Sequence, residues 1–142
     1  PAVWLWPNMD AGTDGVSKAI RVYREHNDSD HIRWYTSLPI EQYGKVLYNS
    51  SCIVGNSSSG IRESAYLGVP AVNIGNRQAG RQRGENVIDV SYDSTQIMSA
   101  IESQIEHGEY ESADIYGNGN SAEIIVDILT EYEFEIQKHL EF

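Results

Sequence analysis

The stretch CIVGNSSSGIRESAYLGVPAVNIGNRQAGRQRG, from Cys52 to Gly84, decides the fold of this chain. An apolar run at Ser51–Val54 opens it and is typical of a buried parallel strand. A helix of one or two turns is expected from Ile61, until Gly68–Pro70 stops it. Ala71–Ile74 then supplies a second strand. The stretch therefore predicts a βαβ unit.

The loop that leaves the first strand, Gly55–Gly60, favours an anion. In a βαβ unit such a loop brings backbone N–H groups and a helix N-terminus to one point, where geometry and dipole both suit phosphate. Ser57, Ser58 and Ser59 add three hydroxyl groups at that point. Serine is also preferred at helix caps for purely structural reasons, so these residues alone leave a capping role open.

Charged residues around the loop favour a nucleotide. Glu63 lies one turn into the predicted helix, where a carboxylate reaching back could accept two hydrogen bonds from a diol. Arg77, Arg81 and Arg83 follow the second strand, and a guanidinium suits phosphate. Arg81 and Arg83 either close over the ligand or only decorate their loop. An anion site, a diol acceptor and a cation together indicate a nucleotide.

The rest of the chain continues the alternation of strand and helix. The other elements are expected as a strand at Val3–Trp6, a helix from Thr13 or Asp14, a strand at His31–Tyr35, a helix after Pro39, a strand at Asn86–Val90 and a helix from Asp93 or Ser94. This order predicts an α/β fold, a Rossmann-like parallel sheet with helices on both faces. Asn8, Leu38, Ser57 and Arg77 all follow predicted strands and are expected to share the ligand-binding rim.

A final helix is expected after the loop at Gly108–Asn120. Asn120 and Glu123 resemble a capping arrangement for it. Its apolar positions form a stripe that is expected to be core or interface: Ile124, Ile128, Leu129, Tyr132, Ile136 and Leu140.

Composition bounds the class of protein. The 142 residues, 40% of them hydrophobic, fit one domain with one core. No run of about 18 apolar residues and no signal-peptide pattern is present, which predicts no membrane partner. The single cysteine, Cys52, excludes an internal disulfide and fits a reducing cytoplasm. The four histidines lack metal-ligand spacing, so neither a metal site nor a cofactor is expected.

The net charge of −11 is concentrated at the end of the chain. Residues 101–142 hold 11 acidic side chains against Lys138 alone, whereas residues 1–100 hold 10 acidic and 9 basic ones. This balance argues against nucleic-acid binding. A nucleotide site must therefore be locally basic, which the three arginines permit because screening acts over roughly 10 Å.

Six segments resemble the C-terminal domain of UDP-N-acetylglucosamine 2-epimerases, and more narrowly the hydrolysing branch that makes free N-acetylmannosamine for sialic-acid-type sugars. These segments are Trp6–Gly12, Gly55–Glu63, Gly68–Pro70, Asn73–Gln78, Gly84–Val87 and Ile115–Asn120. Together they span nearly the whole chain. The resemblance implies the C-terminal half of a GT-B type two-domain fold, with residues 1–142 as the UDP-binding domain.

The resemblance also implies roles for individual residues. It implies that Ser57, Ser58 and the N–H groups around Gly60 bind the diphosphate of UDP and that Glu63 binds its ribose. It further implies that Arg77 contacts a phosphate or the leaving group, that the Leu38 backbone faces uracil, and that Asn8 lies at the edge of the site. Similar enzymes eliminate UDP across C1–C2 and then add water with inversion at C2. Their acid–base groups lie in parts absent here, so no catalytic residue is expected in this chain.

We expect the chain to be a fragment that starts at the second strand of the domain, lacks one central strand and cannot epimerise alone. Three functions stay open: a hydrolysing 2-epimerase, acting on UDP-N-acetylglucosamine or on a UDP-diacetamido-trideoxyhexose; a non-hydrolysing 2-epimerase or GT-B glycosyltransferase; and a non-catalytic nucleotide-sugar-binding module. The partner is a UDP-sugar in each case, and similar enzymes imply a homodimer at full length.

Overall fold

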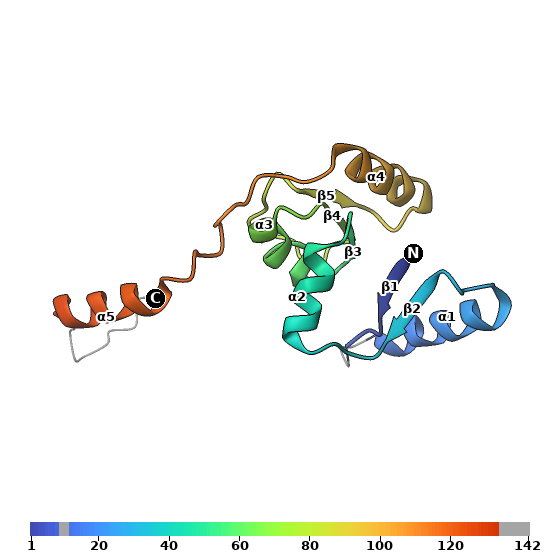
Figure 1. The fold of residues 1–142 in the computed structure, drawn as a ribbon, viewed down its shortest axis with the longest axis horizontal. Coiled ribbons are helices and arrows are strands. Elements are labelled where there is room, and N and C mark those ends of the chain that lie inside the picture. Colours follow the sequence, from blue (N-terminus) through green and yellow to red (C-terminus); the bar gives the residue numbers. More distant parts are fainter. Residues whose placement is uncertain (9–11, 134–142) are drawn as a thin grey trace, which may run out of the picture. The chain divides into compact units, whose positions relative to one another are not determined.

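A computed structural model describes residues 1–8 and 12–133 of the chain. Two compact units make up the structure, Pro1–Val46 and Leu47–Phe142, and each is described by itself. The first contains β1 (Ala2–Leu5), α1 (Thr13–His26), β2 (Ile32–Tyr35) and most of α2 (Ile40–Tyr48). The second contains β3 (Ile53–Gly55), the 3₁₀ turn η1 (Ser58–Gly60), α3 (Glu63–Leu67), β4 (Ala71–Ile74), β5 (Val87–Val90), α4 (Ser94–His107) and α5 (Ser121–Glu131) (Figure 1).

Aromatic packing holds the first unit together. β1 and β2 pair in parallel, which sets Trp4 beside Trp34. Their rings stack with centroids 5.0 Å apart, and the Arg24 guanidinium of α1 lies over Trp34 at 5.2 Å. Stacked rings and a cation over a ring face each add to plain area burial. The aromatic residues thereby fix α1 against this two-stranded sheet.

The second unit has the order β3-β4-β5, with all strands parallel. The central strand β4 is buried at three of its four positions, as expected of a strand covered on both faces. Ile61 and Ala65 pack into the same core, at 0% and 1% exposure. The strand predicted at Ala71–Ile74 therefore has the predicted bounds.

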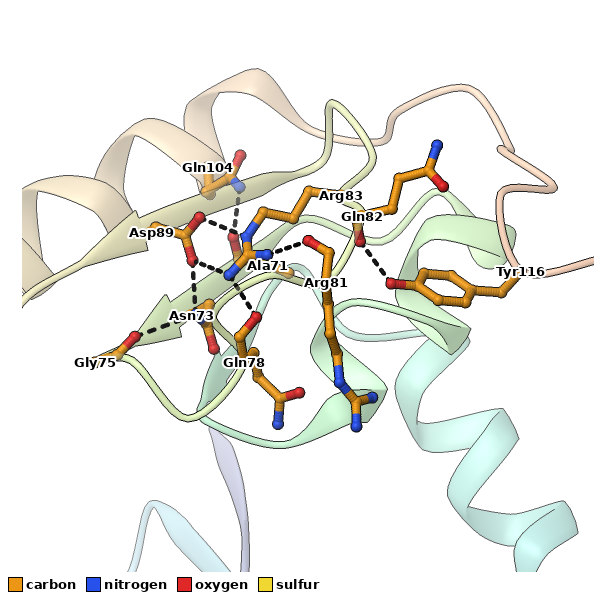
Figure 2. Close-up of polar contacts among 10 residues, drawn as sticks. All are labelled: Ala71, Asn73, Gly75, Gln78, Arg81, Gln82, Arg83, Asp89, Gln104 and Tyr116. Atoms are coloured by element: carbon orange, nitrogen blue, oxygen red, sulfur yellow. Dashed lines mark hydrogen bonds and ion pairs between the residues drawn. The ribbon is translucent and has the colours of Figure 1, made fainter. Parts of the chain in front are cut away.

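Two buried amide side chains join the layers of the second unit. The Nε2 group of Gln104 on α4 donates to the Ala71 carbonyl oxygen at 2.8 Å (Figure 2). It also donates to the Asn86 carbonyl oxygen at 2.7 Å. Asn86 Nδ2 in turn donates to the Val69 carbonyl at 2.7 Å and the Ser64 hydroxyl at 3.0 Å. Because an unpaired buried polar group is costly, these bonds fix α3 and α4 against the sheet.

The parallel α/β fold, Rossmann-like and in keeping with a GT-B type domain, is confirmed, but the strands are divided between two sheets where one was expected. Apolar side chains remain exposed on both sheets, with Val3 and Trp4 on β1 at 45% and 41% and Val54 on β3 at 42%. The absence of a central strand from the chain stays a prediction.

Helix ends agree in part with the sequence. The Asp93 carboxylate caps α4 as predicted, by accepting the Gln96 N–H at 2.9 Å. Asn120 stands at the start of α5, but its side chain makes no capping bond, so that prediction was wrong. A φ of −91° and ψ of 13° take it out of the extended conformation in which N-cap side chains usually act.

The apolar stripe of α5 is exposed instead of forming core. Ile124, Ile128 and Leu129 are 53%, 52% and 61% exposed, while the predicted positions Ile136 and Leu140 lie outside the described residues. Across residues 1–8 and 12–133, no helix combines the length and apolar character needed to cross a membrane.

Candidate functional site

Two loops leave the same edge of the second sheet. β3 and β4 are parallel neighbours with Gly55 opposite Asn73, so the serine loop and the loop after β4 both begin at their carboxyl ends. Gly75 turns the second loop with a φ of +77°, a left-handed conformation that favours glycine. This edge is where ligands of open parallel sheets bind.

The carbonyl oxygen of Asn56 joins the two loops. It accepts a hydrogen bond from Arg77 Nη1 at 3.1 Å and another from Gln78 Nε2 at 2.7 Å. Gln78 is only 1% exposed, so its side chain forms part of the protein interior, whereas Arg77 is exposed. The structure thus brings a guanidinium to the start of the serine loop.

The serines cap the turn that follows them. Ser57 Oγ accepts the Ser59 N–H at 3.3 Å, and the Ser57 carbonyl accepts the Gly60 N–H at 3.1 Å. The Ser58 carbonyl accepts the next two N–H groups, from Ile61 and Arg62. The amides around Gly60, predicted to face the diphosphate, are therefore engaged inside the turn. Within the described residues, no acceptor is bonded to the N–H groups of Ser57 and Ser58.

Glu63 opens α3 and is exposed. Together with Arg62 and Tyr116 it lines an open hollow of about 290 Å³. The Arg62 guanidinium lies 5.6 Å from the centre of the Tyr116 ring, and the Tyr116 hydroxyl donates to the Gln82 carbonyl at 2.6 Å (Figure 2). Tyr116 thus connects the Ile115–Asn120 segment to the loop that follows β4.

The structure decides between the two roles left open for Arg83. Its guanidinium donates to both carboxylate oxygens of Asp89, at 2.6 and 3.1 Å, and to the carbonyls of Gln78 and Arg81 (Figure 2). Arg83 is therefore bonded to its own loop and to β5, whereas Arg81 is exposed. Burial alone would raise the pKa of Asp89, but hydrogen bonds from Arg83 and Asn73 and the charge of Arg83 hold that pKa below its ordinary value.

Asn8 and Leu38 belong to the first unit. Asn8 is exposed, and its carbonyl accepts the Thr13 hydroxyl at 2.6 Å; Leu38 is half-buried. Because each unit is described by itself, the rim they were predicted to share with Ser57 and Arg77 stays a prediction.

Sequence reasoning missed three residues at this edge. Gln78 was not singled out, although a glutamine beside Arg77 at the end of a strand is a usable signal. Tyr92, which follows β5, covers Gly75 so closely that a Cβ there would overlap its hydroxyl. For Tyr116, the sequence indicates only that it belongs to the Ile115–Asn120 motif. Within the part of the chain that the structure describes, no three His, Cys, Asp or Glu side chains gather as metal ligands do.

Comparison with known proteins gives the family. Residues 1–130 match the model of the family described as UDP-N-acetylglucosamine 2-epimerase. The chain is 32% identical over 117 residues to a UDP-N-acetylglucosamine 2-epimerase of Neisseria meningitidis serogroup B, covering 82% of this chain and 30% of that protein. It is also 32% identical over 127 residues to a UDP-N,N'-diacetylbacillosamine 2-epimerase (hydrolyzing) of Legionella pneumophila, covering 89% and 33%.

A third relative is the polysialic acid biosynthesis protein P7 of Escherichia coli, 34% identical over 100 residues, which are 70% of this chain and 25% of that protein. The chain thus spans about a third or less of the length of the relatives it matches. The family match covers most of the residues, both strand-end loops among them. The chain belongs to the UDP-N-acetylglucosamine 2-epimerase family.

Proposed function

We propose that this chain is the UDP-binding portion of a hydrolysing 2-epimerase that converts UDP-N-acetylglucosamine and water to N-acetylmannosamine and UDP. The observation that carries the proposal is the junction at the Asn56 carbonyl, which holds Arg77 beside the serine loop. A nucleoside diphosphate needs a cation and N–H donors at one point. Family membership supports a nucleotide sugar as the ligand.

Each residue of the site has a role in this proposal. The N–H groups and hydroxyls of Ser57 and Ser58 donate to the diphosphate. Arg77 stabilises the negative charge that UDP gains as the C1–O bond breaks, and removing one such donor from an enclosed site costs about 3 kcal/mol. Glu63 accepts hydrogen bonds from the ribose hydroxyls. The base that removes the C2 proton belongs to a part of the enzyme outside this chain.

A titration of UDP into the protein tests the site. Saturable binding is expected in the parent protein, and Arg77→Ala and Glu63→Ala should each weaken it at least about tenfold if they contact the ligand. Glu102→Gln, an exposed carboxylate on α4, is the matched control and should bind as the parent does. Parent-like binding in both site variants would place the nucleotide elsewhere.

A second substrate is favoured by one relative. The Legionella protein is named for UDP-N,N'-diacetylbacillosamine, and its match covers more of this chain than that of the Neisseria epimerase. We therefore also propose a UDP-diacetamido-trideoxyhexose as a substrate of the same site. Incubating the full-length protein with each UDP-sugar and identifying products by NMR distinguishes the two. Release of the free 2-epimeric sugar together with UDP supports hydrolysis, whereas an epimeric UDP-sugar contradicts it.

A further inference from the structure

An ion pair between Arg83 and Asp89 anchors the loop that carries Arg77. Residues 75–86 connect β4 to β5 without forming a helix or strand. Arg83, near the end of this loop, binds Asp89 of β5 through two parallel N–H···O bonds. Asn73 Nδ2 of β4 donates to the same carboxylate at 2.6 Å (Figure 2). Asp89 is thereby held to the sheet on one side and to the loop on the other.

The same guanidinium reaches the residue next to Arg77. Arg83 Nη2 donates to the Gln78 carbonyl at 3.0 Å. The Gln78 side chain donates to the Asn56 carbonyl, which also accepts from Arg77. A continuous series of hydrogen bonds therefore runs from Asp89 through Arg83 and Gln78 to the point where Arg77 meets the serine loop.

The burial and geometry of the Arg83–Asp89 pair indicate that it orients the loop and adds little to the overall stability of the protein. The side chains of Arg83 and Asp89 are 23% and 46% exposed, and an ion pair this open to water contributes little to the stability of a protein. A bidentate guanidinium–carboxylate pair nevertheless fixes the mutual orientation of both groups. Lysine cannot reproduce that geometry, because its ammonium is a point charge.

We propose that Arg83 and Asp89 are positioning residues for the UDP site: acting through Gln78, they hold Arg77 where it contacts the diphosphate. The inference rests on the proposed function, and it goes beyond it by assigning a role to two residues that do not touch the ligand.

A double-mutant cycle on UDP affinity tests the proposal. Asp89→Asn should weaken UDP binding about tenfold, and Arg77→Ala should cost much less in the Asp89→Asn background than in the parent, because residues that act through one network are not additive. Glu102→Gln, which removes the same charge from α4, should leave the affinity unchanged. Equal losses on Arg77→Ala in both backgrounds, or parent-like binding by Asp89→Asn, would overturn the proposal.

Amide hydrogen exchange separates this proposal from the nucleotide site itself. Without UDP, Asp89→Asn and Arg83→Lys should both speed exchange across residues 76–83, because local opening is what exchange measures. The thermal midpoint should stay within a few degrees of the parent value, since an exposed pair adds little stability. Parent-like exchange in these variants refutes the anchoring, whatever the ligand. Faster exchange in both variants, together with a parent protein that does not bind UDP, refutes the nucleotide site alone and leaves the anchoring standing.

Discussion

Replacing Gln104 by methionine should destabilise the second unit substantially. Gln104 is fully buried and makes three hydrogen bonds, to the Ala71 and Asn86 carbonyls and from the Tyr110 hydroxyl at 2.7 Å. Methionine has a similar volume, so the substitution removes polar contacts without leaving a large cavity. The effect therefore isolates the hydrogen bonds.

The size of the stability loss in Gln104→Met depends on which hydrogen bonds the former partners of Gln104 keep. The Asn86 carbonyl keeps its bond from the Ala71 N–H at 2.8 Å, and the half-buried Tyr110 hydroxyl can turn to water. At about 1 kcal/mol for each lost bond, with an added cost for burying the groups unpaired, the expected loss of unfolding free energy is about 2–4 kcal/mol.

Urea denaturation followed by far-UV circular dichroism measures this loss, with amide exchange in β4 and β5 as the local reading. Tryptophan fluorescence is unsuitable, because Trp4, Trp6 and Trp34 all lie in the first unit. Gln82→Met, at an exposed glutamine, is the matched control and should change stability by less than about 0.5 kcal/mol. A loss below about 1 kcal/mol for Gln104→Met would refute the reasoning.

Three further predictions concern single residues. Burial raises the pKa of the Cys52 thiol to about 11 from the usual 9.0, against an opposing hydrogen bond from the Val72 backbone, so at pH 8 its thiolate is about 100-fold rarer than that of an unburied cysteine. Iodoacetamide should label Cys52 correspondingly slowly, and labelling at the rate of the unfolded chain would contradict this. Asp89 has a lowered pKa, so its contribution to stability is complete above the ordinary carboxyl pKa and is lost as the pH falls through the folded-state value. Urea midpoints should therefore drop less between pH 6 and pH 3 in Asp89→Asn than in the parent. Equal drops would argue against a stabilising Asp89 carboxylate. Gly68→Ala should lower the unfolding free energy by about 2 kcal/mol or more, because a φ of +69° strains alanine and its Cβ would overlap the Tyr110 carbonyl oxygen. Gly80→Ala, at a φ of +78° with open space around it, should lower it by only about 1 kcal/mol. Equal losses in chemical denaturation would mean that the close approach to Tyr110 has no effect.

Local patterns in the sequence were sufficient for the secondary structure of the motif. The apolar run before Gly55 and the Gly68–Pro70 stop signal are read from neighbouring residues, and they gave the βαβ unit with β4 at its predicted bounds. Parallel pairing of β3 and β4 then places the loops that follow them at one edge. Arg77 and the serine loop could therefore be predicted as neighbours, because strand alternation alone fixes that edge.

Which polar groups face one another was decided by tertiary structure. The Ser57 carbonyl accepts the Gly60 N–H and the Ser57 hydroxyl accepts the Ser59 N–H, so η1 is a turn closed by its own hydrogen bonds. The sequence does not distinguish such a turn from an open anion-binding loop. Arg81 and Arg83 are the same residue type in the same loop, yet it is Arg83 that binds the Asp89 carboxylate. The sequence does not reveal this, because Asp89 belongs to the next strand.

Residues 1–142 by themselves determined the order of strands and helices, the family and the edge of the sheet where a ligand would bind. These depend on periodicity, on turn residues and on motifs that are continuous in the chain. The tertiary structure alone decided the division into two sheets, the buried bonds of Gln104 and the junction of Gln78 and Arg77 at the Asn56 carbonyl. Such contacts join residues 18 to 33 positions apart, and only the packed chain brings their donors and acceptors within hydrogen-bonding distance.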